Sequence, residues 1–167
     1  MFHRPLGLTD ACDLDVNSET DHLGEWWGNE VKLTRKFFER HKLTVGGEYR
    51  DNLSQDMKNW DLEMYLNARK SSRIWAFYFQ DEFSLRENLL LNVGVRYDHY
   101  DSFGGTVNPR VALIYNLKQT SVKLLYGEAF RAPNTFEQFY TSSVDFKPNP
   151  HLKPETIKTY ELVLGSF

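Results

Sequence analysis

The chain has 167 residues, a net charge of −3 at pH 7 and scattered rather than clustered Lys and Arg. That size suits one ordinary domain, and the charge gives no electrostatic case for binding nucleic acid. The longest apolar runs, at 74–79 and 111–115, are far shorter than the roughly 20 residues of a membrane-spanning helix, which excludes a helical membrane protein. Aromatic residues make up 15% of the chain, so they must either fill a core or face apolar surroundings.

Apolar and polar residues alternate with a period of two along much of the chain, which indicates β-strands. The clearest case is 89–99, where Leu91 and Val93 share one face while Asn92 and Gly94 share the other. In chain order, we expect strands at 25–37, 42–50, 74–85, 89–99, 107–117, 121–129 and 157–166. The sequence therefore predicts an all-β fold, an antiparallel up-and-down meander of about seven strands.

The connections between these strands alternate in length. Tight connections at 38–41, 86–88 and 118–120 alternate with others at 51–72, 101–106 and 130–156, of which the first and last are long. Membrane barrels show this asymmetry, with short periplasmic turns and longer extracellular loops. On this interpretation the odd strands run inward and the even strands run outward.

Alternation by itself leaves two folds open, because a soluble sandwich also has one apolar and one polar face per strand. The expected strand lengths of roughly 9–12 residues favour a membrane barrel, whose tilted strands need about 9–11, over globular strands of about 5–6. A soluble β-sandwich binding module would bury Trp75, Phe77 and Phe79 in a core. A membrane barrel would present the same side chains to lipid.

Several short stretches resemble one known family in the family's own order. They are Trp-Ala-Phe-Tyr-Phe-Gln-Asp-Glu-Phe at 75–83, Leu-Leu-Leu-Asn-Val-Gly-Val-Arg-Tyr-Asp at 89–98, Asn-Pro-Arg-Val-Ala-Leu-Ile-Tyr at 108–115, Phe-Arg-Ala-Pro-Asn-Thr-Phe-Glu at 130–137, Asn-Pro-His-Leu-Lys-Pro-Glu at 149–155 and Tyr-Glu-Leu-Val-Leu-Gly at 160–165. Together they resemble the carboxy-terminal part of the barrel in TonB-dependent outer-membrane receptors, over about residues 25–167.

The resemblance implies a bacterial outer-membrane location and a partial segment of a 22-stranded transmembrane β-barrel. It implies active uptake of a siderophore, cobalamin or similar scarce nutrient. The implied partners are outer-membrane lipid, TonB through the plug region of the parent receptor, and a small-molecule ligand such as a metal chelate. A passive porin-like barrel fragment is an alternative, against which the motif at 130–134 argues.

The chain also departs from the family pattern. The sequence has no counterpart of the amino-terminal plug or TonB-contacting segment, and Met1 does not begin a signal peptide. We therefore expect an internal barrel segment: residues 1–22 form a poorly structured segment or an extracellular loop remnant, and residues 23–167 form the partial barrel. Seven strands with open edges cannot span a bilayer alone, so transport would belong to the parent receptor.

Arg131 and Asn134 open the long connection at 130–156, and the rings of Phe136 and Tyr140 follow them. We expect these four residues to contact ligand, with Arg131 near an anionic group. The structural alternative is that Arg131 bonds carbonyls or a carboxylate and that the rings pack the loop on itself. Charged residues on the polar phase, which we expect to form cross-strand pairs or to grip a plug, are Glu82, Arg96, Asp98, Arg110, Lys123 and Glu161. The sequence predicts no enzyme, no catalytic group, no metal site and no cofactor.

Overall fold

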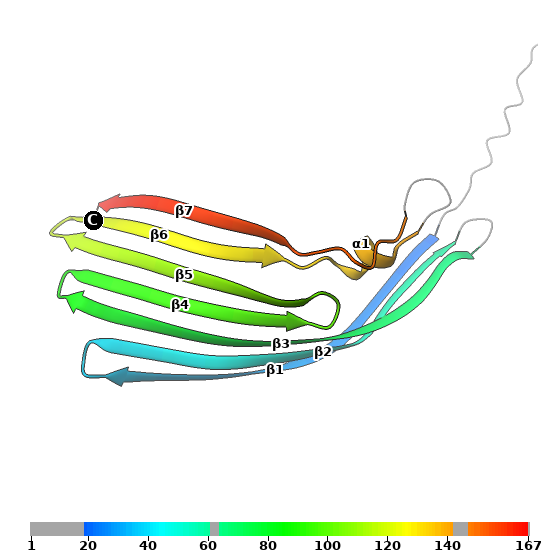
Figure 1. Cartoon of the computed structure of the whole chain (residues 1–167), viewed down its shortest axis with the longest axis horizontal. Helices are drawn as coiled ribbons and strands as arrows, with labels where there is room; N and C mark the ends of the chain where they lie inside the picture. Colours follow the sequence, from blue (N-terminus) through cyan, green and yellow to red (C-terminus); the bar gives the residue numbers. More distant parts are fainter. Residues whose placement is uncertain (1–18, 61–63, 142–146, 167) are drawn as a thin grey trace, which may run out of the picture.

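The computed structural model describes residues 19–60, 64–141 and 147–166. Within them the chain forms one antiparallel sheet of seven strands, paired strictly in chain order, and one short helix (Figure 1). The elements are β1 (Glu19–Phe37), β2 (His41–Trp60), β3 (Met64–Arg86), β4 (Leu89–Tyr100), β5 (Gly104–Leu117), β6 (Thr120–Arg131), α1 (Thr135–Phe139) and β7 (Glu155–Ser166). The predicted all-β up-and-down meander is confirmed.

In the part of the chain that is described, no helix is long or apolar enough to cross a membrane.

Successive connections lie alternately at the two ends of the sheet, and the long one, at 132–154, joins β6 to β7. The tight turns β1–β2, β3–β4 and β5–β6 lie together at one end, and the remaining connections lie at the other (Figure 1). Because each strand pairs with its sequence neighbour, successive strands run in opposite directions between these two ends. We call them the turn end and the loop end.

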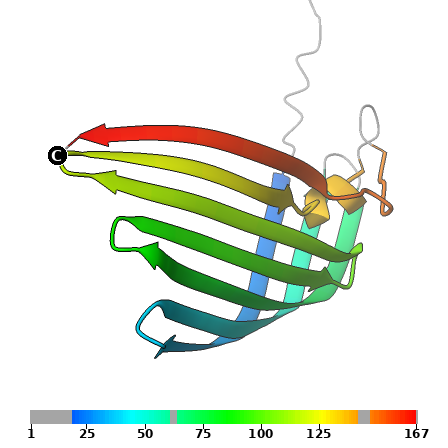
Figure 2. The same cartoon turned by 60° about the vertical axis from the view of Figure 1, so that its left-hand side comes forward.

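The prediction of a long loop at 51–72 is wrong. β2 and β3 remain paired through this region, with Asn52 opposite Ser72 and Asp56 opposite Arg69, and the register shifts between Asn52 and Gln55. We call residues 51–60 and 64–72 the arm, which curves away from the rest of the sheet (Figures 1 and 2). The period-two pattern is lost here because backbone pairing needs no such pattern and because the buried side chains of the arm, Asn52, Ser54 and Met57, are mostly polar.

Residues 1–18 of the expected N-terminal segment lie outside the described residues, and β1 already begins at Glu19, ahead of the expected boundary at 22.

The sheet is a single curved layer without a hydrophobic core (Figure 2). Among the described residues the only buried apolar side chains are Met57 and Ala76. Phe77 and Phe79, which a soluble sandwich would bury, are 64% and 46% exposed. The exposed apolar face includes Val31, Leu33, Val45, Val93, Val95, Val111, Leu124, Leu162 and Leu164. In water such a surface would be an aggregation site, so its natural neighbour is lipid.

Aromatic rings gather on the apolar face toward the loop end. Trp27 packs on Tyr49 with ring centroids 5.5 Å apart, Trp75 stacks on His99 at 4.9 Å, and Tyr126 lies 4.9 Å from Tyr160. On the strands that carry the two tyrosines, an ion pair follows on the same face, with Lys158 Nζ 3.0 Å from Glu128 Oε1. We call these rings the aromatic belt. Such a belt marks the height at which a barrel wall leaves the hydrocarbon.

One polar pair interrupts the apolar face near the turn end. His41 Nδ1 lies 2.7 Å from Asp81 Oδ2, and the His41 ring stacks on Phe83 at 4.1 Å. His41 directly follows the β1–β2 turn. We assign this pair to the interfacial level opposite the aromatic belt, where charged groups cost far less than at the bilayer centre.

Candidate functional site: the polar inner face and the base of the 132–154 loop

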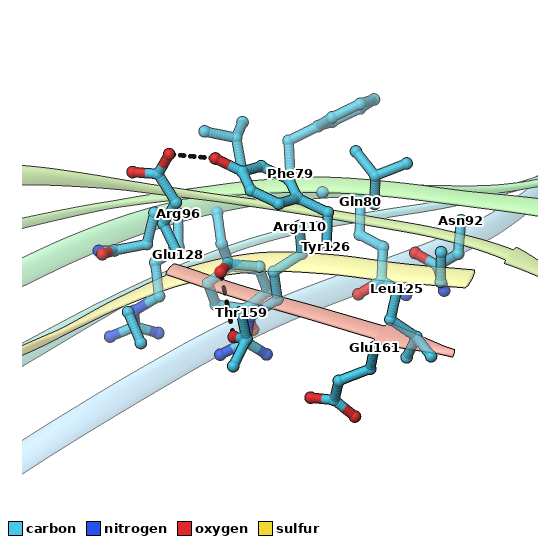
Figure 3. Close-up of a pocket in the computed structure, with 18 of the residues that line it drawn as sticks. Phe79, Gln80, Asn92, Arg96, Arg110, Leu125, Tyr126, Glu128, Thr159 and Glu161 are labelled. Carbon is cyan, nitrogen blue, oxygen red and sulfur yellow. Dashed lines mark hydrogen bonds between the residues drawn. The ribbon is translucent and has the colours of Figure 1, made fainter. Parts of the chain in front are cut away.

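The face opposite the apolar one is concave and polar. It encloses about 810 Å³ between the inner surfaces of β3 to β7 (Figure 3). Its lining includes Glu30, Tyr78, Gln80, Asn92, Arg96, Asn108, Arg110, Leu125, Thr159 and Glu161. Figure 3 shows Phe79 on one side of the sheet and Glu161 on the other, as strand alternation requires. Leu125 is an apolar residue within this otherwise polar part of the lining.

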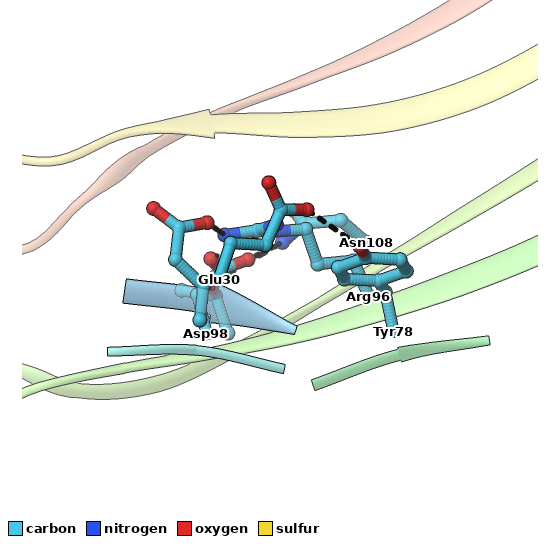
Figure 4. Close-up of polar contacts among 7 residues, drawn as sticks. Glu30, Tyr78, Arg96, Asp98 and Asn108 are labelled. Carbon is cyan, nitrogen blue, oxygen red and sulfur yellow. Dashed lines mark hydrogen bonds and ion pairs between the residues drawn. The ribbon is translucent and has the colours of Figure 1, made fainter. Parts of the chain in front are cut away.

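Arg96 of β4 is the centre of a charge network on the inner face (Figure 4). Its Nη2 donates to Glu48 Oε2 at 2.7 Å, and its Nε donates to Asp98 Oδ1 at 2.8 Å. The other oxygen of Asp98 accepts from Asn108 Nδ2 at 3.2 Å. Asp98 is only 4% exposed, so these partners compensate the desolvation of its carboxylate.

Tyr78 lies across a glycine on the same face. A Cβ built on Gly46 would lie 2.3 Å from the Tyr78 ring and hydroxyl, so only glycine leaves room for this ring position. The Tyr78 hydroxyl donates to Glu30 Oε1 at 2.5 Å, which ties β3 to β1 across β2 (Figure 4). Gly46 therefore has a packing role on the inner wall.

The expected charge pairs form only in part. Arg96 pairs with Glu48 across strands and Glu82 Oε1 accepts from Lys42 Nζ at 3.0 Å, whereas Arg96 and Asp98 pair within β4. Arg110, Lys123 and Glu161 form no ion pair with any residue that the structure describes. In the same parts of the chain, no group of three or more His, Cys, Asp or Glu side chains is placed to hold a metal ion.

At the loop end, Arg131 connects the two sequence motifs on either side of the 132–154 loop. Its Nε and Nη2 donate to the two carboxylate oxygens of Glu155 at 3.1 and 3.0 Å, and its Nη1 donates to Glu137 Oε1 at 2.8 Å. The bidentate pair with Glu155 is the strong planar geometry that arginine favours. One guanidinium thus joins the end of β6, the start of β7 and α1.

The charges of this cluster shift the ionisation of its members. Hydrogen bonds from Arg131 hold the pKa of Glu155 and of Glu137 below the ordinary value of 4.5. The same bonds, to Glu155 first and then to Glu137, raise the pKa of Arg131. All three residues lie beyond the Glu128–Lys158 ion pair, outside the aromatic belt.

Asn134 begins α1 as its N-cap. Its Oδ1 accepts from the Glu137 backbone N at 2.7 Å, and Glu137 Oε2 accepts from the Asn134 backbone N at 3.0 Å. This reciprocal capping box satisfies two backbone donors of a very short helix. Glu137 therefore serves both the helix start and the Arg131 cluster.

The loop reaches from β6 to the arm, over the short β4–β5 connection. Thr135 Oγ1 donates to Gln55 Oε1 at 2.8 Å, and Lys70 Nζ lies 4.4 Å from the centre of the Phe139 ring. Tyr100 stacks on Phe103 at 4.6 Å near the end of β6. α1 is thereby held against the inner side of the arm.

The four predicted ligand contacts all lie at the beginning of this loop. Arg131 and Asn134 are engaged in the contacts just described, and Phe136 stacks on Tyr140 with ring centroids 4.1 Å apart. Ligand contact at these residues stays a prediction. Phe146, a further aromatic residue of this loop, lies outside the described residues. The partners of Arg131, which are Glu137 and Glu155, belong to the sequence motifs at 130–137 and 149–155. The loop contacts Gln55 and Lys70 lie instead at 51–72, the stretch that was wrongly expected to be a loop.

A single curved sheet with an apolar outer face, an aromatic belt and a polar inner face is part of the wall of a membrane β-barrel. Residues 4–165 match the family described as TonB dependent receptor-like, beta-barrel, and the chain belongs to this family. The predicted recognition and bacterial outer-membrane location are confirmed.

Individual relatives agree with this assignment. The chain is 30% identical over 147 residues to an iron-regulated outer membrane virulence protein of Vibrio cholerae, covering 81% of this chain and 22% of that protein. It is 26% identical to the vitamin B12 transporter BtuB of Vibrio cholerae over 90% of this chain and 28% of that protein. The chain thus spans about a quarter of the length of these relatives.

A solved structure shows the same fold. The ferric enterobactin receptor PfeA of Pseudomonas aeruginosa, as a G324V mutant, superposes with a TM-score of 0.70 at 20% identity, over 85% of this chain and 24% of that one.

Proposed function

We propose that this chain supplies neighbouring strands of the barrel wall in a TonB-dependent receptor that takes up a siderophore, cobalamin or similar scarce nutrient. The observation that carries the proposal is the polar concave face below α1 and the Arg131 cluster. Such a face suits a water-filled interior through which a polar ligand passes, and the loop lies at the entrance. Its partners are outer-membrane lipid on the apolar face, a small-molecule ligand such as a metal chelate, and TonB through a plug region.

We further propose that ligand meets the loop at the stacked rings of Phe136 and Tyr140. Arg131 and Asn134 hold the base of the loop beneath these rings, Arg131 through its bonds to Glu137 and Glu155. Aromatic faces contribute large contact area at low conformational entropy, which suits the capture of a rigid chelate.

The test is uptake by bacteria whose only receptor of this family carries these residues. Radiolabelled ferric siderophores, haem and cobalamin are supplied one at a time, with and without a functional TonB. Uptake of one of them that disappears without TonB supports the proposal, and entry of every solute without TonB overturns it in favour of a passive pore. The double variant Phe136→Ala/Tyr140→Ala is expected to lower uptake. The control is Phe38→Ala, in the β1–β2 turn at the turn end.

A further inference from the structure

A small cleft lies between α1 and the arm, apart from the large concavity of the inner wall. Its volume is about 270 Å³. Its walls include Asn52, Lys70, Ser72, Tyr100, Gln138 and Phe139. The cleft is therefore built jointly by the 132–154 loop and the β2–β3 arm, and it exists only while α1 stays docked.

Gln138 contributes an unpaired donor to this cleft. Its side chain is 3% exposed, and its Nε2 has no hydrogen-bond partner among the described residues. A buried amide left without a partner is destabilising, and such groups are rare in folded proteins. The Gln138 amide at the cleft therefore needs a hydrogen-bond acceptor, and no described residue provides one.

The side-chain oxygens of the other amides around the cleft are already engaged. Asn52 Oδ1 accepts from Arg50 Nε at 3.1 Å, and Asn52 Nδ2 donates to Ser72 Oγ at 2.9 Å. The side-chain oxygen of Gln55 accepts from Thr135. Of the two buried amides in the lining, Asn52 and Gln138, Gln138 is the one whose donor has no partner among the described residues.

Lys70 supplies positive charge beside Gln138. Its ammonium lies over the Phe139 ring and forms no ion pair with any residue in the described parts of the chain. The one carboxylate in the lining is Asp101, and its Oδ2 accepts from the Arg73 backbone N at 3.1 Å. The cleft offers a ligand an amide donor and an ammonium, a pair that matches an anionic oxygen, beside one carboxylate that a backbone N–H already binds.

We propose that this cleft is a subsite for a carboxylate, bound by Gln138 Nε2 and Lys70 Nζ. The inference rests on the proposed function in that the subsite lies at the entrance of the receptor. The carboxylate belongs either to a free small organic acid or to one arm of a larger metal chelate. The cleft volume suits a single such group rather than a whole siderophore.

The test is ligand-observed saturation-transfer NMR on the purified receptor in detergent, with citrate and with iron(III) citrate as probes. Gallium(III) replaces iron where paramagnetism broadens the signals. We expect Gln138→Leu or Lys70→Met to weaken binding about tenfold or more. The matched controls are Gln119→Leu and Lys118→Met, in the β5–β6 turn at the turn end, and they are expected to bind like wild type.

Each outcome decides the question. If citrate without metal shows the full saturation transfer, the subsite binds free acids. If only the metal complex shows saturation transfer, the subsite binds an arm of the chelate. No saturation transfer from either probe to a folded receptor overturns the proposal and leaves water as the occupant. Unchanged binding in Gln138→Leu overturns it as well. Failure of the uptake function would appear separately, as absent nutrient transport by a receptor that still binds citrate.

Discussion

Placing a lysine at three positions of β3 tests the orientation of the sheet in the membrane. Phe79 is on the apolar face midway between Trp75 of the aromatic belt and Phe83 near the turn end, and it is 46% exposed. Its neighbour Gln80 points to the opposite, polar face and lines the concavity. A lysine on the lipid face costs about 2–4 kcal/mol at the bilayer midplane and about 0–1 near an interface. We expect Phe79→Lys to lower the free energy of unfolding by about 2–3 kcal/mol more than Phe83→Lys does.

Gln80→Lys should change the free energy of unfolding by no more than about 0.5 kcal/mol, because the new ammonium reaches water and lies near Glu82. The assay is urea unfolding of the receptor barrel in phospholipid vesicles, followed by tryptophan fluorescence. The two Phe→Lys variants lose the same ring, so their difference reports depth together with the loss of the Phe83 stacking on His41. Equal losses at Phe79 and Phe83 would refute the assignment of this face to lipid. A loss at Gln80 as large as that at Phe79 would refute the assignment of the polar face to a water-filled interior.

Three further predictions concern the contacts of the inner face and the loop. The pKa of Glu155, measured by carboxyl ¹³C NMR, should rise toward its ordinary 4.5 in Arg131→Gln. Because the pKa of Glu155 is lowered in the folded state, the stabilisation by the Arg131–Glu155 pair is present above pH 4.5 and is lost as the pH falls through that lowered pKa. A Glu155 pKa that does not change in Arg131→Gln would contradict the hydrogen-bonded cluster. Gly46→Ala should displace the Tyr78 ring and destabilise the barrel by about 1–3 kcal/mol in chemical unfolding, whereas Gly24→Ala, with no atom within 4 Å of the new Cβ, should cost much less. Arg96→Met should destabilise by about 1–3 kcal/mol because Asp98 remains buried with fewer partners, and Arg110→Met, which breaks no ion pair with a described residue, is the control that should stay within about 0.5 kcal/mol.

The seven strands could be predicted because lipid on one side and water on the other impose a period of two, as in 89–99. The same physics explains the error at 51–72, where the arm continues as paired strands without that pattern. The register of strand pairs, the positions of bulges and the backbone pairing cannot be predicted from the residue types alone. Strand existence was therefore predictable inside the membrane and not beyond it.

The candidate site was predictable only in its local part. Arg131 and Asn134 stood out because the motif at 130–137 is specific. The bond from Arg131 to Glu155 spans a whole loop, and nothing in the spacing of the two motifs requires it. Gln138 has no distinguishing signal in the sequence, since its burial depends on α1 docking against the arm.

The position of the aromatic belt also fixes which bilayer this wall fits. From Trp75 of the belt to Phe83 near the turn end, β3 rises about 26 Å along its own axis at about 3.3 Å per residue. With the tilt of about 40° usual for such strands, the apolar band is about 20 Å tall. Hydrophobic mismatch costs a fraction of a kcal/mol for each Å, and the bacterial outer membrane is thinner than average. The height of this band therefore sorts the protein toward a thin membrane, and lengthening the acyl chains of a reconstituted bilayer should progressively destabilise the barrel.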